Sequence, residues 1–245
     1  MRNFRIIIQY EGTRYQGWQK QNSSENTLQG KFEQLLSRMA GEPVQIHASG
    51  RTDAGVHAYG QVANFHMDTR LTPVELMEQI NSYLPEDVAV ISCVEAAPRF
   101  HSRLNAVSKT YRYRILNSDV PHVFDRKFVW QYSDRLDLEK MRRAAGILCG
   151  THDFASFTST KKSKKSTVRT ITDIRIEKVG DEVQLTFEGD GFLFHMVRIL
   201  TGTLVEVGSG KRDVSDMETL LTAGKRELAG PLVPAKGLAL MEVRY

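Results

Sequence analysis

Cysteine is scarce in this chain of 245 residues, which contains only Cys93 and Cys149. Neither lies in a C-x-x-C pair or beside a histidine cluster, so the spacing predicts neither a disulfide nor a metal site. Both sit in apolar surroundings, which is typical of buried free thiols. No apolar run approaches the roughly 20 residues that a membrane-spanning helix needs, and the N-terminus enters a strand pattern without a signal-peptide core. We therefore expect a cytoplasmic protein without metal or membrane contacts.

The common signatures of nucleotide-dependent and hydrolytic enzymes are also missing. The sequence has no Walker A loop, no H-E-x-x-H and no G-x-S-x-G, which are the local patterns that those chemistries require. Gly189 and Gly191 are spaced as in a dinucleotide-binding loop, but the remaining glycine does not follow. The sequence therefore carries none of the local patterns of these enzyme classes.

Acidic residues are absent from two segments that are rich in lysine and arginine, 96–118 and 154–172, each with five basic residues. Of 33 basic residues in the chain, the ten in these segments leave 23 against 29 acidic residues. One such segment is often a solvated face, but two together favour a polyanionic partner such as a nucleic acid. The second segment contains a lysine cluster that we interpret as a loop contacting phosphate: Lys161, Lys162, Lys164 and Lys165.

Periodicity divides the chain into two similar halves. The first reads β-α-β-β-α-β, the split order of ferredoxin-like units, and Thr72-Pro73-Val74-Glu75 predicts a capped helix start within it. The second half repeats this order loosely, with strands expected at 107–116, 168–179, 182–188 and 237–245. We therefore expect an α+β fold of two ferredoxin-like (RRM-like) halves, 1–106 and 107–245. Without a linker between them, the halves are expected to share one continuous, mostly antiparallel sheet with helices packed on it.

The run Ser49–His57, with the sequence SGRTDAGVH, lies between two strand-like segments and has no apolar stripe of its own. An aspartate beside a glycine is usually an Asx turn or a helix cap. A turn gains nothing from Arg51 and His57, however, so their presence favours a functional carboxylate. Asp53 is therefore the leading candidate for a catalytic residue, with Arg51 and His57 as candidates for substrate binding.

Arg198 lies in FHMVRIL, a helical segment that is apolar almost all round. Such an arginine either extends its charge to water or pairs with a carboxylate, because an unpaired buried charge is very costly. Asp53 is the available carboxylate with an unusual context. A pair with Arg198 would stabilise its ionised form.

Tyr111 lies on a strand where aromatic and basic residues interleave. Tyrosines on a half-buried strand most often serve packing. Here Lys109 and Arg112 flank Tyr111, and that combination suits stacking on bases and contact with phosphates. We include all three among the candidate substrate-binding residues.

Beyond these residues, the sequence contains an ordered series of short motifs. They are YEGT at 10–13, GWQKQ at 17–21, TLQG at 27–30, SGRTDAGVHA at 49–58, GQVANF at 60–65, N-x-x-L-P at 81–85, FHSR at 100–103, KTYRY at 109–113, GTHDF at 150–154, GFL at 191–193, MVR at 196–198 and PAKGL at 234–238. The series resembles the TruA-type tRNA pseudouridine synthases across almost the whole chain.

This resemblance implies an isomerase that converts uridine to pseudouridine in the anticodon stem-loop, at positions 38, 39 and 40 of tRNA. It implies a homodimer that needs neither metal nor cofactor. It also implies that Asp53 is catalytic, that Arg198 forms a salt bridge with it, and that Tyr111 packs against the target uracil and assists proton removal from C5. Arg51 would occupy the space that the extruded base leaves.

Two alternatives stay open at this point. One is a pseudouridine synthase with a different RNA target, and the other is a non-catalytic chaperone that binds tRNA. Both would keep the basic segments. The presence of Asp53, Tyr111 and Arg198 together favours an enzyme over a chaperone.

Overall fold

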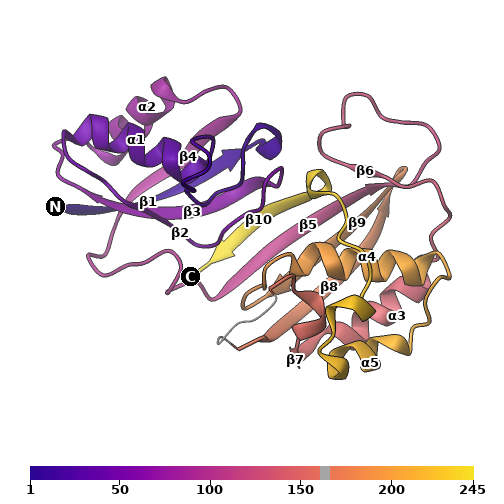
Figure 1. Cartoon of the computed structure of the whole chain (residues 1–245). Coiled ribbons are helices and arrows are strands. Elements are labelled where there is room, and N and C mark those ends of the chain that lie inside the picture. The colour runs from indigo at the N-terminus through magenta and orange to yellow at the C-terminus, as the bar shows by residue number, and fades with distance from the viewer. Residues whose placement is uncertain (161–165) are drawn as a thin grey trace. The chain divides into compact units, whose positions relative to one another are not determined.

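The computed structural model describes residues 1–160 and 166–245 of the chain. They form two compact units, one made of Met1–Val107 with Ala239–Tyr245 and the other of Ser108–Leu238 (Figure 1). The lysine cluster at 161–165 lies outside the described residues, so its contact with phosphate stays a sequence prediction.

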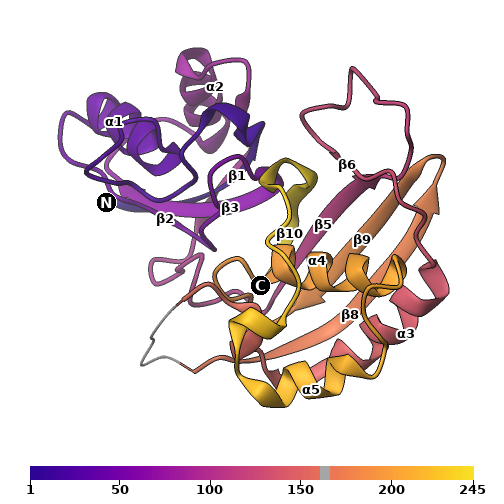
Figure 2. The same ribbon diagram turned by 45° about the vertical axis from the view of Figure 1, so that its right-hand side comes forward.

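The first unit follows the predicted β-α-β-β-α-β order. Its elements are β1 (Arg2–Tyr10), α1 (Leu28–Ala40), β2 (Ile46–Ala48), β3 (His57–Met67), α2 (Pro73–Tyr83) and β4 (Val88–Ala96), with a 3₁₀ turn at Gly12–Arg14. β1 is central and pairs antiparallel with β3 and β4, while β2 pairs antiparallel with the C-terminal half of β3. Helices α1 and α2 lie over one face of this sheet (Figures 1 and 2). The ferredoxin-like expectation for this half is confirmed.

Alternation along β1 explains how the sheet and its helices share a core. Phe4, Ile6 and Ile8 are fully buried, whereas Arg5 and Ile7 between them are partly exposed. Because successive side chains of a strand point to opposite faces, the three buried residues form one apolar face. The apolar stripe of α1 is buried in the same way.

The C-terminal strand, β10 (Leu238–Arg244), belongs with the first unit rather than with the second. It pairs in parallel with the start of β3, at Ala239 opposite His57 and Leu240 opposite Ala58. β2 pairs only with the other end of β3, so this stretch of the β3 edge is open to β10. The division therefore differs from the expected 1–106 and 107–245 in its last residues.

The second unit is also a sheet with helices over one face (Figures 1 and 2). Its elements are β5 (Ser108–Leu116), β6 (Trp130–Gln131), α3 (Leu138–Leu148), β7 (Gly150–Asp153), β8 (Val168–Val179), β9 (Glu182–Gly189), α4 (Met196–Gly208) and α5 (Asp216–Ala223), with 3₁₀ turns at Ala155–Phe157, Arg226–Leu228 and Ala235–Gly237. β9 pairs antiparallel with β5 and β8, and β7 pairs antiparallel with β8. The three long strands predicted for this half are confirmed; β6 and β7 are too short for periodicity to detect.

Two expectations drawn from composition can be compared with this fold. Within residues 1–160 and 166–245, every helix is too short or too polar to cross a bilayer. Both cysteines are free thiols, and Cys93 is buried while Cys149 is half-buried. Burial raises the pKa of Cys93 to about 11, so this thiol stays protonated at neutral pH.

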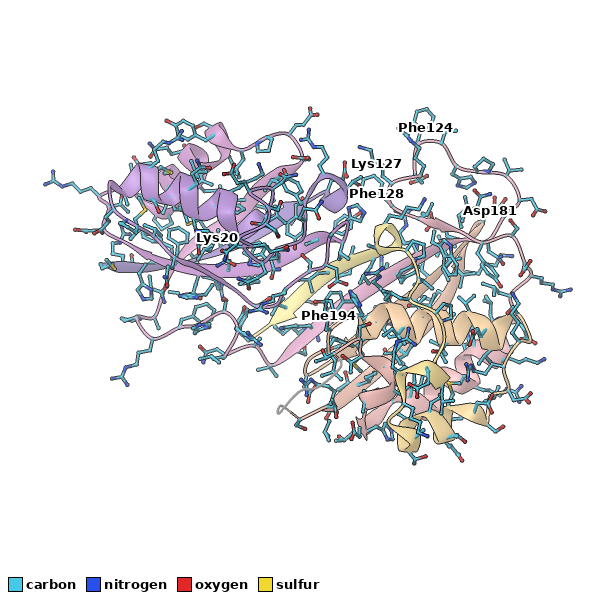
Figure 3. The ribbon with its side chains drawn as sticks, viewed as in Figure 1. Lys20, Phe124, Lys127, Phe128, Asp181 and Phe194 are labelled. Atoms are coloured by element: carbon cyan, nitrogen blue, oxygen red, sulfur yellow. The ribbon has the colours of Figure 1, made fainter. Side chains whose placement is uncertain are left out.

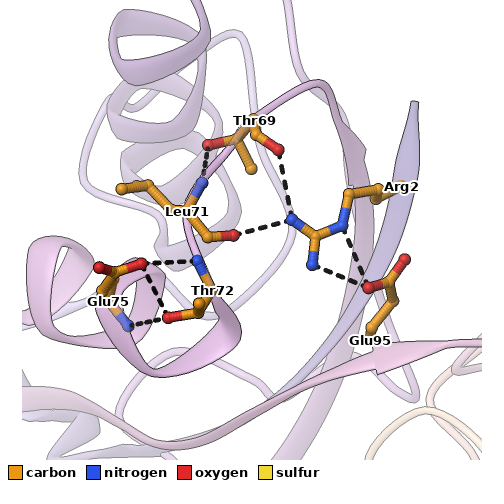
Figure 4. Close-up of polar contacts among 6 residues, drawn as sticks. All are labelled: Arg2, Thr69, Leu71, Thr72, Glu75 and Glu95. Carbon is orange, nitrogen blue, oxygen red and sulfur yellow. Dashed lines mark hydrogen bonds and ion pairs between the residues drawn. The ribbon is translucent and has the colours of Figure 1, made fainter.

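The predicted cap of α2 is present in full (Figure 4). The Thr72 hydroxyl accepts a hydrogen bond from the Glu75 amide at 3.3 Å, and the Glu75 carboxylate accepts one from the Thr72 amide at 2.8 Å. Arg2 donates to the Leu71 carbonyl at 2.7 Å and pairs with Glu95 at 2.8 Å. The start of α2 is thereby tied to the edge of the sheet.

We expect Thr72→Ala to lower the free energy of unfolding by about 1 kcal/mol, because it removes the acceptor for an amide at the helix start. Thr72→Ser, which keeps the hydroxyl, is the matched control. Hydrogen bonds from Thr72 lower the pKa of Glu75. The contribution of the hydrogen bond from the Thr72 hydroxyl to this carboxylate is present above the usual glutamate pKa of 4.5 and is lost as the pH falls through the lower folded value. Urea unfolding across this pH range measures the loss of stability and its dependence on pH. Equal stability of Thr72→Ala and Thr72→Ser at neutral pH would contradict the cap.

Candidate active site

The loop that carries the candidate aspartate, Ser49–Val56, is here called the Asp53 loop. It connects β2 to β3 and begins with Ser49, which is fully buried. The Ser49 amide donates to the Val62 carbonyl at 2.8 Å, and its hydroxyl donates to the Gln61 side chain at 2.8 Å. Gln61 in turn donates to the Gly50 carbonyl at 2.9 Å. A buried glutamine on β3 thus holds the first two residues of the loop.

Thr52, which precedes the candidate aspartate, is held through both its backbone and its side chain. Its carbonyl accepts a hydrogen bond from the Trp18 amide at 3.0 Å. Its hydroxyl lies 2.8 Å from the Tyr10 hydroxyl. Burial raises the pKa of Tyr10 to about 12, so this partner stays neutral at physiological pH. The position of Asp53 is therefore set by a residue with almost no freedom of its own.

The segment after β1 lies directly against the Asp53 loop, and glycine makes that approach possible. Gly17 has a φ of +83°, and a Cβ added there would lie 2.7 Å from the Thr52 carbonyl oxygen. A side chain at Gly12 would collide with the Val56 carbonyl in the same way. Gly55 donates its amide to the Tyr15 carbonyl at 3.3 Å. The sequence alone does not reveal these supports, although Gly12 and Gly17 lie in the motifs YEGT and GWQKQ.

Held in this way, the loop presents its charged residues outward. Asp53 is half-buried, and Arg51 and Ala54 are exposed. The Val56 amide donates to the Asp53 carbonyl at 3.1 Å, which closes a turn around the aspartate. The only carboxylate of the loop is therefore accessible at the surface of its unit while its backbone is tied on both sides.

His57 lies in the interior rather than at the surface. Its side chain is 3% exposed, and its Nδ1 accepts a hydrogen bond from the Gly12 amide at 3.0 Å. An Nδ1 that accepts carries no proton. The geometry places His57 among the supports of the loop, so we now assign it a positioning role instead of the expected substrate contact.

Tyr111 sits on β5 in the second unit and is almost fully buried, with 8% of its surface exposed. It lies opposite Phe187 of β9, and the Phe192 ring meets it edge-on at 5.3 Å between centroids. Strand alternation puts Lys109 on the same face as Tyr111 and Arg112 on the opposite face. The Arg112 side chain donates to the Thr186 hydroxyl at 3.3 Å. Tyr111 and Lys109 can therefore serve one site together, which Arg112 does not face.

Arg198 lies in the first turn of α4 and is half-buried. Its Nε donates to the Val233 carbonyl at 2.8 Å. Tyr113 is nearby: burial raises the pKa of its phenol, and the positive charge of Arg198 opposes that shift. The Tyr113 hydroxyl donates to the Pro234 carbonyl at 2.7 Å. The same short segment thus anchors both side chains.

The helix start before Arg198 has an unusual backbone. His195 has a φ of 66°, the only positive φ among the described non-glycine residues. Such a φ is uncommon outside glycine, although histidine adopts it more often than most residues. Its Nδ1 lies 2.9 Å from the Ser159 hydroxyl, and the Phe194 ring stacks on it at 3.6 Å between centroids. Phe194 itself is largely exposed on this unit (Figure 3). The strained residue fixes where α4 begins, and so where Arg198 lies.

Asp53 belongs to the first unit, and Tyr111 and Arg198 to the second. The expected salt bridge between Asp53 and Arg198 therefore stays a prediction. Across residues 1–160 and 166–245, histidine, cysteine and carboxylate side chains form no group of three or more that could hold a metal ion.

Known proteins resemble this chain over its whole length. A sequence model of the family described as tRNA pseudouridine synthase matches residues 6–105 and 144–245. The tRNA pseudouridine synthase A of Bacillus sp. (strain KSM-64) is 43% identical, as is that of Acetivibrio thermocellus, and the tRNA pseudouridine synthase A 1 of Clostridium tetani is 44% identical. Each match spans 245 residues and the whole of both chains. This chain belongs to the tRNA pseudouridine synthase family, whose members are isomerases that convert uridine in tRNA to pseudouridine.

Similarity to solved structures is more distant. One chain in a crystal structure of a Cbf5-Nop10-Gar1 complex matches with a TM-score of 0.37 and 12% identity, over 83% of this chain and 45% of that one. A structure of an H/ACA RNP bound to a substrate RNA containing 2′-deoxyuridine matches with a TM-score of 0.36 and 11% identity, over 83% of this chain and 44% of that one. These likenesses carry no conclusion about the activity of this chain.

Alanine substitutions at two glycines distinguish the cost of a strained backbone from a steric clash with the Asp53 loop. Gly17 and Gly41 have similar φ values, +83° and +75°, but a Cβ at Gly41 meets nothing within 4 Å. Alanine at either position costs about 1 kcal/mol of stability through the left-handed backbone. Only Gly17→Ala pushes on Thr52, so we expect it alone to lower kcat for pseudouridine formation by about tenfold or more, as misplacement of a reacting group does. Equal kcat values for the two variants would show that the approach of Gly17 does not position Asp53.

Proposed function

We propose that this enzyme isomerises uridines 38, 39 and 40 in the anticodon stem-loop of tRNA, with Asp53 as the catalytic carboxylate. The proposal rests on the geometry of the Asp53 loop. It presents one carboxylate, half-buried, on a backbone fixed by Tyr10, Trp18 and Gln61. In a chain of this family, a carboxylate held in this way suits a reaction at the sugar of a target nucleotide.

The reaction needs few parts. The N1–C1′ bond breaks, the uracil turns, and a C5–C1′ bond forms; C5 loses a proton and N1 gains one. No atom is added overall and nothing is oxidised. A carboxylate near C1′ either adds to the sugar as a nucleophile or removes a proton from C2′, and both routes use its ionised form. The detached uracil must stay close enough to recombine, so a confined pocket is part of the catalysis.

Tyr111 and Lys109 supply the second half of such a pocket in this proposal. The Tyr111 ring, packed edge-on against Phe192, gives a firm aromatic surface for a pyrimidine and a hydroxyl that can take part in proton transfer at C5. Lys109 shares that face and can contact a phosphate next to the target. Arg51, exposed beside Asp53, would fill the gap in the RNA that the extruded base leaves. Extrusion costs a few kcal/mol, which contacts with the rest of the RNA offset.

The role proposed for Arg198 is to stabilise the negative charge of Asp53. Its Nε is engaged by Val233, which fixes the direction of the guanidinium group. An arginine held in this way and paired with Asp53 would favour the ionised carboxylate. We further propose that the protein works as a homodimer in the cytoplasm, with tRNA as its partner and without a cofactor.

Asp53→Asn is expected to abolish pseudouridine formation while leaving tRNA affinity within about twofold, because the amide keeps the size of the side chain but removes the nucleophile or base. Asp68→Asn, at an exposed aspartate of the same unit, is the matched control and should keep full activity. The measurement is single-turnover formation of pseudouridine together with tRNA binding. Substantial residual isomerisation by the Asp53 variant would refute the assignment.

Mapping of pseudouridine in bulk tRNA tests the target. The tRNA should come from cells that lack the corresponding activity, and the purified protein is added to it. New pseudouridine at 38, 39 and 40 supports the proposal. Modification elsewhere would keep the chemistry and overturn the target, and tight binding without modification would favour the chaperone alternative.

The proposed pair of Asp53 with Arg198 predicts that the effects of the two substitutions on the melting temperature do not add. Arg198→Gln leaves the Asp53 carboxylate without its proposed partner and should lower the melting temperature. Adding Asp53→Asn to that variant removes the stranded charge, so the double variant should melt at a higher temperature than Arg198→Gln alone. Losses in melting temperature that simply add would argue against the pair.

A further inference from the structure

Three histidines that take no part in the proposed mechanism gather on the first unit. His47 is on β2, His66 is on β3, and His101 is in the loop that follows β4. The His47 and His101 rings stack, with centroids 4.9 Å apart and planes 30° apart. The His66 Nε2 lies 3.2 Å from the Pro98 carbonyl oxygen of the same loop. We call these residues the histidine cluster.

Buried polar contacts hold the cluster together. The Ser102 hydroxyl donates to the His47 carbonyl, and the Ser102 amide donates to the Asn64 side chain at 2.9 Å. Asn64 is buried on β3 and also donates to the Phe100 carbonyl at 3.3 Å. The loop that carries His101 is therefore fixed to both strands, so the stacking of the two rings is a built feature of the fold.

The charges around the cluster are mainly positive. Burial lowers the pKa of His47, and the neighbouring His101 and His66 act in the same direction. Glu33 acts in the opposite direction, but it is itself paired with Lys20 at 3.3 Å. Arg103, which is exposed, follows His101 in the loop, and residues 96–118 contain no acid.

The aromatic groups behind the loop add little negative charge. The Tyr245 hydroxyl donates to the Ser102 carbonyl at 2.7 Å, and burial raises the pKa of this phenol, so it stays neutral. The Arg5 guanidinium lies over the Phe100 ring at 5.8 Å and contributes another positive charge. A fixed group of imidazoles bordered by arginines suits an anion, because each imidazole that binds a proton then meets a negative charge.

We propose that the histidine cluster, with Arg103, binds a phosphate of the tRNA backbone and takes up a proton when it does so. The ligand follows from the proposed function, because tRNA is the polyanion on which this family acts. The position supports it as well: His47 is two residues before Ser49, where the Asp53 loop begins. The same strands that carry the cluster, β2 and β3, border that loop.

The sign of the pH dependence follows from the charges. In the free protein, burial together with His101 and His66 keeps the pKa of His47 below its usual value of 6.5. A bound phosphate favours the protonated imidazole and raises that pKa. Binding therefore takes up a proton, and tRNA affinity rises as the pH falls through the range between the free and bound values.

The test compares tRNA dissociation constants at pH 6 and pH 8 and at one ionic strength, because salt alone changes such affinities strongly. The probe is an unmodified tRNA transcript. The wild type should bind about fivefold more tightly at pH 6, which corresponds to an average uptake of about 0.35 proton over this pH interval. His47→Gln/His101→Gln should lose most of this difference. His122→Gln, at a half-exposed histidine of the second unit, is the matched control and should keep it. A double variant with the full wild-type difference would overturn the proposal.

A second measurement needs no substitution. The imidazole Cε1–H resonances of the wild-type protein are titrated with and without the transcript. The pKa of His47 should rise on addition of the tRNA, and an unchanged pKa would overturn the proposal even if the double variant folds poorly. Neither assay depends on catalysis. Pseudouridine outside the anticodon arm would overturn the proposed target only, whereas normal modification without proton uptake would overturn this inference only.

Discussion

The structure of the first unit depends on one close contact, between the segment after β1 and the Asp53 loop. A loop without regular structure can hold a carboxylate in one place only if its backbone is bonded to something more rigid. Here the Trp18 amide and the Gly17 backbone meet the Thr52 carbonyl, and a side chain at Gly17 would prevent it. β1 is the central strand of its sheet, so the position of Asp53 is linked to a strand that is hydrogen-bonded on both edges.

This constraint also explains why so many polar groups are buried around the loop. Ser49, Gln61 and Asn64 are almost completely inaccessible, yet each makes hydrogen bonds. No buried side-chain nitrogen or oxygen in residues 1–160 and 166–245 lacks a hydrogen-bond partner. A buried polar group without a partner costs about 1–3 kcal/mol, so a satisfied network strongly favours one geometry over its neighbours. The network gives the loop its single shape, which apolar packing alone would not specify.

Local sequence patterns predicted the features that depend only on residues close together in the chain. Alternation predicted β9, and a Thr-Pro-x-Glu pattern predicted the cap of α2. A glycine turn with surplus polar residues made Asp53 the candidate carboxylate, and that role stays a prediction. Features that depend on residues far apart in the chain were not predicted. His57 binds an amide 45 positions away, and nothing beside it in the sequence distinguishes that role from substrate contact. β10 has the pattern of a strand, but only its pairing with β3 shows which unit it joins. The salt bridge of Asp53 with Arg198 and a sheet shared by both units remain predictions of the same long-range kind.

β2 and β3 connect the two sites argued for this unit. They border the Asp53 loop, and they also carry His47 and His66. Asn64 and Gln61, three residues apart on β3, bond to the His101 loop and to the Asp53 loop respectively. A phosphate held at the histidine cluster would therefore be positioned by the same rigid pair of strands as the proposed catalytic carboxylate. The proposed mechanism aligns one ribose carbon with that carboxylate, so fixing the RNA backbone from the same strands would reduce the freedom that remains to be lost in the reaction.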